Sequence, residues 1–171
     1  MGLILTIDDF EVGRTKIALD PEQETDLESY IEQVENDYLP KLFGVDLYNL
    51  FVIDFNLPLA GTPKGRFIIP FNEFNLQNDC VLIQSIGIEE MLKCFVYYLY
   101  LRDDVTRSTT VGLERILGEN SEKANGISHD LTSRYNEGVD AFRTIQHYMS
   151  QFNAIDYPEY KGVNLSYANV Y

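Results

Sequence analysis

The chain has 171 residues, enough for one domain with a substantial core and too few for two comfortable ones. Its 27 acidic and 13 basic side chains give a formal net charge of −14. Because such a surface repels phosphate backbones and anionic lipids, the composition argues against a basic groove for nucleic acid and against docking on a membrane. We expect a soluble, acidic domain made inside a cell.

The termini and the cysteines agree with that expectation. The N-terminus has no basic flank and meets Asp8 and Asp9 at once, unlike a signal peptide. No apolar run reaches the roughly 18 residues that a membrane span needs. Two cysteines, Cys80 and Cys94, are too few for a disulfide framework and indicate a reducing compartment.

The first predicted helix begins at Asp20-Pro21, an N-cap followed by proline at the first helical position. Apolar residues then recur at the three- and four-residue spacing of a single buried stripe: Leu27, Tyr30, Ile31, Val34, Tyr38 and Leu42. Pro40 should kink or end this helix near Leu39, and a shorter helix should resume at Asp46.

Charge is concentrated on this helix, because residues 20–39 contain eight acids and no base. The simplest interpretation is a solvated helix face. A sharper interpretation is a surface that repels DNA passing nearby, or one that meets a basic partner.

The middle of the chain alternates loops with apolar segments. Residues 57–85 are rich in proline and glycine, which predicts a long ordered loop or an edge hairpin. Residues 88–101 are apolar on almost every side and predict a central, covered helix. Residues 102–117 predict a loop or a small hairpin, and a last helix should begin near Ser121.

The C-terminal residues 153–171 show no periodicity and predict an extended arm. The expected fold is therefore mainly α: a helical domain over residues 1–152, with a proline-rich loop or small hairpin, followed by the arm. We find no internal repeat.

Candidate catalytic and metal-binding residues are few. His129 and His147 lie 18 residues apart on one predicted helix, roughly 27 Å along its axis, so they cannot share an ion. Cys80 and Cys94 lack zinc-site spacing, and Cys94 is expected in the core. The pairs Asp8-Asp9, Glu89-Glu90 and Asp103-Asp104 are sequence neighbours, which should point in different directions. We therefore predict no enzyme, no cofactor and no metal.

Aromatic residues are better candidates for a functional surface, since the chain has 12 tyrosines and 10 phenylalanines. Four tyrosines lie in the predicted arm, which suggests a subunit or partner interface: Tyr157, Tyr160, Tyr167 and Tyr171. An extended arm can lie on a neighbouring subunit. The alternative is that these are core tyrosines in an ordinary tail.

Several segments resemble the head–tail connector, or adaptor, proteins of tailed phages, and in part the neck ring proteins of crAss-like phages. The segments are Leu5 to Phe10, Glu35 to Gly44 with Leu47-Tyr48, Ser85 to Leu92, Phe95 to Arg102, Thr110-Val111-Gly112, Glu119-Asn120-Ser121 and Tyr135-Asn136. Residues 57–79 match nothing in that pattern.

The resemblance implies a structural virion protein, made in the host cytoplasm and located in the neck between capsid and tail. Copies of the chain would form a dodecameric ring beneath the portal protein, with a channel for the genome and a docking surface for other neck or tail proteins. Genome DNA would pass through without specific binding. Deleting residues 153–171 should then abolish ring assembly and leave the monomer folded.

A second class stays open. The chain could be a cytosolic acidic helical binding module, or a regulator, that acts on a protein partner. A connector needs an arm for its neighbour, whereas a regulator does not.

Overall fold

The computed structural model describes residues 2–17, 21–56, 63, 65–78, 81–104, 108–109, 112–113 and 121–168. The fold is mainly helical, as the sequence predicts. Its helices are α1 (Pro21–Phe43), α2 (Val45–Phe55), α3 (Ile68–Phe71), α4 (Gly87–Asp104) and α5 (Ser121–His147), with the 3-10 turns η1 (Ile7–Phe10) and η2 (Gly65–Phe67) and one π-helical turn, η3 (Tyr148–Phe152). Two small hairpins complete it: β1 (Phe74–Asn78) with β2 (Val81–Ser85), and β3 (Ser108–Thr109) with β4 (Gly112–Leu113).

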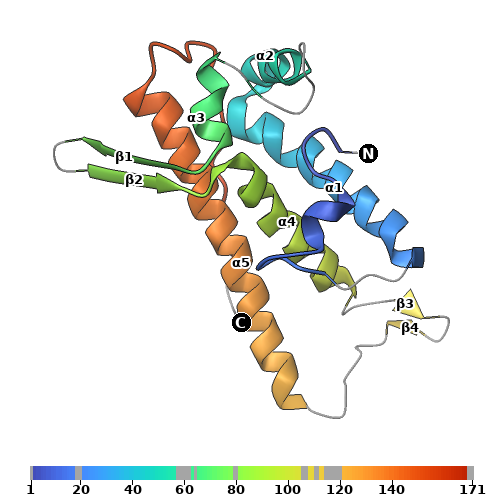
Figure 1. The fold of residues 1–171 in the computed structure, drawn as a ribbon. Helices are drawn as coiled ribbons and strands as arrows, with labels where there is room; N and C mark the ends of the chain where they lie inside the picture. Colours follow the sequence, from blue (N-terminus) through green and yellow to red (C-terminus); the bar gives the residue numbers. More distant parts are fainter. Residues whose placement is uncertain are drawn as a thin grey trace.

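Helix α4 is the centre of the molecule and lies between α1 and α5 (Figure 1). Its apolar residues are buried on the sides that face both neighbours, which confirms the expected central helix. Tyr38 of α1 stacks on Phe95 of α4, with ring centroids 4.2 Å apart. On the other side Phe95 meets Tyr135 of α5 at 5.4 Å.

Gly138 allows α5 to approach α4 closely. A Cβ atom at this position would lie 2.8 Å from Cε1 of Phe95 and 3.2 Å from Cβ of Cys94. Gly138 is thus a point of close contact between the last helix and the central helix.

Helix α1 differs from the sequence prediction at its end. It continues through Pro40 to Phe43, so the alternative that the helix ends near Leu39 is wrong. Pro40 lies in the last turn, and the carbonyl that its missing N–H would have bonded belongs to Asn36, an exposed residue that water can reach. The helix ends instead at Gly44, whose φ of +79° places it in the left-handed region.

Of the two structures predicted for residues 57–85, a loop or a hairpin, the hairpin is present at the end of this stretch. Strands β1 and β2 pair antiparallel, with Phe74 opposite Ser85 and Leu76 opposite Ile83. The described prolines of this stretch, Pro63 and Pro70, lie before the strands, so neither removes a ladder hydrogen bond. The segment 66–69 forms η2 and the start of α3.

One end of the molecule is formed by α2, α3 and the chain that follows α5 (Figure 1). Helix α2 packs on η2 and α3 through phenylalanine rings: Phe51 lies 5.4 Å from Phe67, and Phe55 lies 5.7 Å from Phe71. We refer to this region as the α2–α3 end. Among the described residues, no helix is long and apolar enough to cross a membrane.

Candidate assembly surface

The C-terminal arm lies on its own chain. Gln146 of α5 donates to the Val163 carbonyl at 3.1 Å, and Arg143 donates to the Leu165 carbonyl. About two turns further back, the Asn136 side chain accepts from the backbone N–H of Ala168 at 2.9 Å. The arm therefore runs antiparallel to α5, held by side chains that bond its backbone, whereas the sequence suggested that it reaches a neighbouring subunit.

Tyr157 anchors the first half of the arm in the core and is only 2% exposed. Its ring contacts Phe67 and Tyr148, with centroids 6.3 and 6.0 Å away, and its hydroxyl donates to the Arg66 carbonyl. Burial raises the pKa of this phenol. Tyr157 is therefore a core residue of its own chain, whereas the sequence suggested that it lies at an interface.

The other arm tyrosines differ in their exposure. Tyr160 is half-buried against the core, and burial raises the pKa of its hydroxyl. Tyr167 is 44% exposed; its hydroxyl donates to Asp140 at 2.6 Å, and the Arg143 guanidinium lies 4.0 Å from its ring centroid. Tyr171 lies outside the described residues. Of the described three, Tyr167 is the most exposed.

Several aliphatic side chains of α2, α3 and the turn after α5 are exposed, a feature that the sequence analysis missed. Ile53 is 57% exposed and Ile155, in the turn after α5, is 95% exposed. The set comprises Val45, Leu50 and Ile53 of α2, Ile68 and Ile69 of α3, and Ile155. A signal was present in the sequence, because residues 45–55 hold apolar residues on more sides than one buried stripe requires.

The acidic run lies on α1 and is mostly exposed, as expected for a solvated face. The exposed acids include Glu24, Asp26, Glu28, Glu32 and Asp37. Glu24, Glu28 and Glu32 follow one another at four-residue spacing, so like charges are neighbours along the helix.

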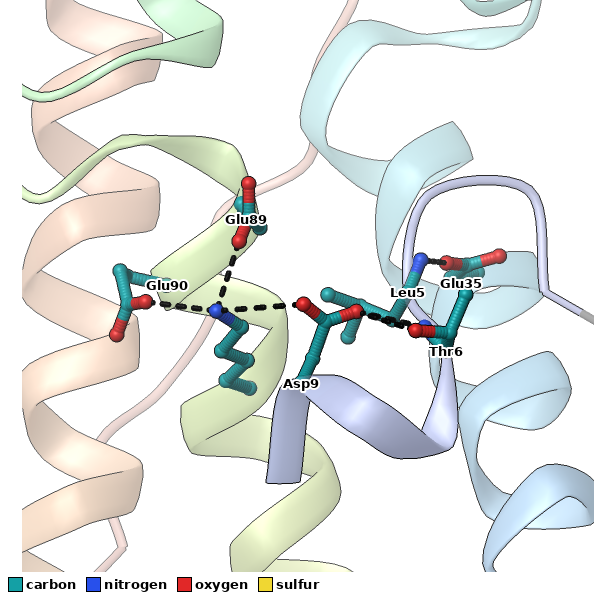
Figure 2. A network of polar contacts seen from close by, with 7 residues as sticks. Leu5, Thr6, Asp9, Glu35, Glu89 and Glu90 are labelled. Carbon is teal, nitrogen blue, oxygen red and sulfur yellow. Dashed lines mark hydrogen bonds and ion pairs between the residues drawn. The ribbon is translucent and has the colours of Figure 1, made fainter. Parts of the chain in front are cut away.

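Glu35 is the exception within that run, because it is only 3% exposed. Its carboxylate accepts a backbone hydrogen bond from Leu5 at 2.7 Å (Figure 2). It accepts two more, from the backbone of Ile4 at 2.8 Å and from that of Leu3. A buried carboxylate is tolerated where such donors replace water. Glu35 therefore fixes the N-terminal segment on α1.

Three carboxylates converge on Lys93, which is 8% exposed. Its Nζ lies 2.7 Å from Glu89, 2.9 Å from Glu90 and 3.9 Å from Asp9 (Figure 2). The expectation that Glu89 and Glu90 diverge is thus wrong; their three- and four-residue spacing to Lys93 was the available signal.

The contacts of this cluster suit a structural role. Burial alone would lower the pKa of Lys93, but hydrogen bonds to Glu89 and Glu90 outweigh it, so the pKa is raised. A lysine with a raised pKa stays protonated and cannot serve as a base or nucleophile near neutral pH. Asp9 also accepts from the Thr6 backbone at 2.8 Å, so the cluster ties η1 to α4.

The remaining candidates for chemistry are dispersed. His129 and His147 are both exposed on α5. Cys94 is buried, and burial raises the pKa of its thiol to about 12. Cys80 lies outside the described residues. Within the described part of the chain, no three His, Cys, Asp or Glu side chains are grouped as metal ligands would be.

Comparison with known proteins gives no relative. No family model matches the chain, and no curated protein or solved structure matches it significantly.

Proposed function

We propose that this chain is a structural subunit of the head–tail connector, or neck, of a tailed phage. Copies would form a dodecameric ring beneath the portal protein, with a channel for the genome and a docking surface for other neck or tail proteins. Its location would be the virion, after synthesis in the host cytoplasm. The role is structural rather than enzymatic.

The observation that carries this proposal is the division of the surface into two kinds. Aliphatic side chains of α2, α3 and the turn after α5 are exposed, whereas the outer face of α1 is acidic. Aliphatic side chains that lie in water favour burial against another protein. An anionic face has no affinity for a passing phosphate backbone, because both carry the same charge. A subunit of a DNA-conducting ring needs both properties.

The polar clusters support a structural role. The Lys93 cluster and the Glu35 carboxylate hold the N-terminal segment on α4 and α1. Protonated Lys93 and buried Cys94 are poorly suited to act as nucleophiles. The mainly helical fold agrees with the connector resemblance.

The test is quantitative mass spectrometry of purified virions of the phage that encodes the chain. Peptides of the chain are scaled to those of the portal protein, and an early non-structural phage protein serves as the contamination control. We expect near one-to-one stoichiometry with the portal protein. Absence of the chain from clean particles would overturn the proposal.

That absence would favour the second candidate, an acidic helical binding module or regulator in the cytosol. The acidic face of α1 is the observation behind it, since residues 20–39 contain no base. Such a face attracts a basic protein partner.

A further inference from the structure

The β1–β2 hairpin extends to one side of the helices, and both of its strands are edge strands (Figure 1). One face of the hairpin packs on the domain: Phe74 and Ile83 are buried, and the Phe74 ring lies 5.3 Å from that of Tyr148. The other face carries exposed side chains, among them Gln77 and Gln84. The hairpin is therefore held on the domain by one face alone.

The outer edges of the two strands carry backbone groups without a partner strand. In an antiparallel pair, every second residue turns its N–H and C=O groups away from the other strand. Among the described residues, no backbone–backbone hydrogen bond joins β1 or β2 to any segment except its partner. Residues 82–84 line a groove with Arg143 and His147 of α5, so the space beside β2 is open to solvent. Each edge thus presents a row of groups that a further strand can bond.

Neither strand has the features that keep sheet edges apart. Natural edge strands are protected by charged side chains, lysine above all, by proline or by a bulge. The strand sequences FNLQN of β1 and VLIQS of β2 contain no charged residue and no proline, and their register is continuous, without a bulge. The nearest acids in sequence, Glu73 and Asp79, precede and follow β1. In a chain with 27 acidic and 13 basic side chains, the two strands are thus an uncharged strip.

We propose that the edges of this hairpin join neighbouring copies of the chain, with β2 of one copy paired to β1 of the next. Because β1 and β2 run antiparallel, copies related by the rotation of a ring bring β2 and the next β1 together antiparallel as well. Repeated around the ring, this pairing closes a sheet in which no edge stays unpaired. The inference rests on the proposed function and deepens it, because it names the contact between subunits of the ring.

Charge selects a second copy as the occupant. Each copy carries a formal net charge of −14, so contacts between acidic faces of two copies are repulsive. Pairing two uncharged strands avoids that repulsion, and the groove beside β2 adds one acid and one base, Asp140 and Arg143. The exposed amide side chains Asn75, Gln77 and Gln84 can hydrogen-bond those of an adjacent strand. The hairpin therefore suits self-association of an acidic chain.

Sedimentation velocity of the purified full-length chain, across a concentration series, tests the inference. We expect the wild-type chain to self-associate. Gln77→Lys with Gln84→Lys places a lysine at an exposed position of each strand and should weaken association at least about tenfold, because edges that carry lysine repel each other. Leu82→Lys, a single change at another exposed position, should weaken association less. Circular dichroism verifies that each variant folds.

The matched control is Gln33→Lys with Asn36→Lys, at exposed positions of α1. Each double variant adds two positive charges and changes the net charge from −14 to −12, so both reduce the general repulsion between copies. The control should therefore associate at least as tightly as the wild type. Loss of association in the hairpin variant alone reports the edge contact.

Hydrogen exchange followed by mass spectrometry locates the contact. Peptides that cover residues 74–85 should exchange more slowly at concentrations where the wild-type chain associates, because new ladder hydrogen bonds protect the edge amides. The hairpin double variant should show no such protection at the same concentrations.

Four results would overturn the inference. Two concern the wild-type chain: a monomer at every concentration, or association that leaves the exchange of residues 74–85 unchanged. The other two concern the variants: association of the hairpin double variant as tight as that of the wild type, or an equal loss in both double variants. The virion measurement uses phage particles and this one the purified chain, so the proposed function and this contact fail separately.

Discussion

The carboxylate of Glu35, in the middle of α1, accepts a hydrogen bond of 2.7 Å from the backbone N–H of Leu5, 30 residues earlier in the chain. The same carboxylate bonds the two preceding amides, of Leu3 and Ile4. One side chain thus satisfies three consecutive backbone donors and holds fully buried Leu5 in the core. It joins the start of the chain to its first helix.

We predict that Glu35→Ala destabilises the protein by about 2–4 kcal/mol, because three backbone donors lose their acceptor in a largely buried site. Glu35→Gln should cost about half as much, since the amide oxygen still accepts. Urea unfolding measures both. Glu28→Ala, at an exposed position of the same helix, is the control and should stay within about 0.5 kcal/mol of wild type. Equal stability of the Glu35→Ala and Glu28→Ala variants would contradict the prediction.

Tyr157 should be the arm residue that matters for folding. Tyr157→Ala removes a buried ring and should cost about 3 kcal/mol, and Tyr157→Phe, which loses only the hydrogen bond to the Arg66 carbonyl, about 1 kcal/mol. Tyr167→Ala is the matched control at an exposed position and should cost less than Tyr157→Phe. The midpoint of thermal unfolding reports the order. A larger loss for Tyr167→Ala would show that the anchor lies elsewhere.

Two truncations separate the halves of the arm. Ending the chain after Asn164 keeps Tyr157 and the bond from the Val163 N–H to the Lys41 carbonyl, so the fold should persist. Ending it after Phe152 removes Tyr157 and exposes Phe67 and Tyr148, so the truncated chain should be strongly destabilised. The second truncation differs from the expectation, drawn from the sequence, that deleting residues 153–171 leaves the monomer folded. Size-exclusion chromatography with circular dichroism distinguishes the two truncations.

Gly138→Ala should destabilise the protein although alanine favours helices. The gain in helix propensity is about 1 kcal/mol, whereas forcing a methyl group into the α4–α5 contact costs about 1–3 kcal/mol. The methyl group would meet the Phe95 ring, which has no free space to move because it is packed between Tyr38 and Tyr135. Phe95→Leu should therefore be less harmful in the Gly138→Ala background than alone, in a double-mutant cycle of unfolding free energies. Additive effects would refute this coupling.

Cys94 should resist alkylation in the folded state. Its thiol pKa of about 12 leaves almost no thiolate at pH 8, and the side chain is buried. Because the folded pKa is raised, the stability associated with the thiol is fully present below the unfolded pKa of about 8.5 and is lost as pH rises toward 12. In a Cys80→Ser variant, iodoacetamide should label Cys94 only after denaturation. Rapid labelling of the native variant would contradict the buried position.

The helices were predictable from the sequence because their signals are local. The apolar spacing of Leu27, Ile31 and Val34 identifies the buried stripe of α1, and Gly44 marks its end. The excess of acids on α1 was likewise visible. Periodicity does not show which partner each stripe meets, so the close approach of α5 to α4 at Gly138 emerged only from the fold.

Most residues of the candidate surface could not be predicted from local sequence patterns. The sequence suggested that four arm tyrosines form an interface, but Tyr157 lies in the core of its own chain. The position of the arm could not be predicted, because α5 side chains bond its backbone carbonyls and such bonds leave no pattern in the arm's sequence. Glu35 looked like one more surface acid, because its partners are amides distant in the chain. Composition and local periodicity determined the net charge and the helices. Only the tertiary structure decided which apolar side of α2 faces Phe67 and which leaves Ile53 in water, because that choice depends on contacts between segments distant in sequence.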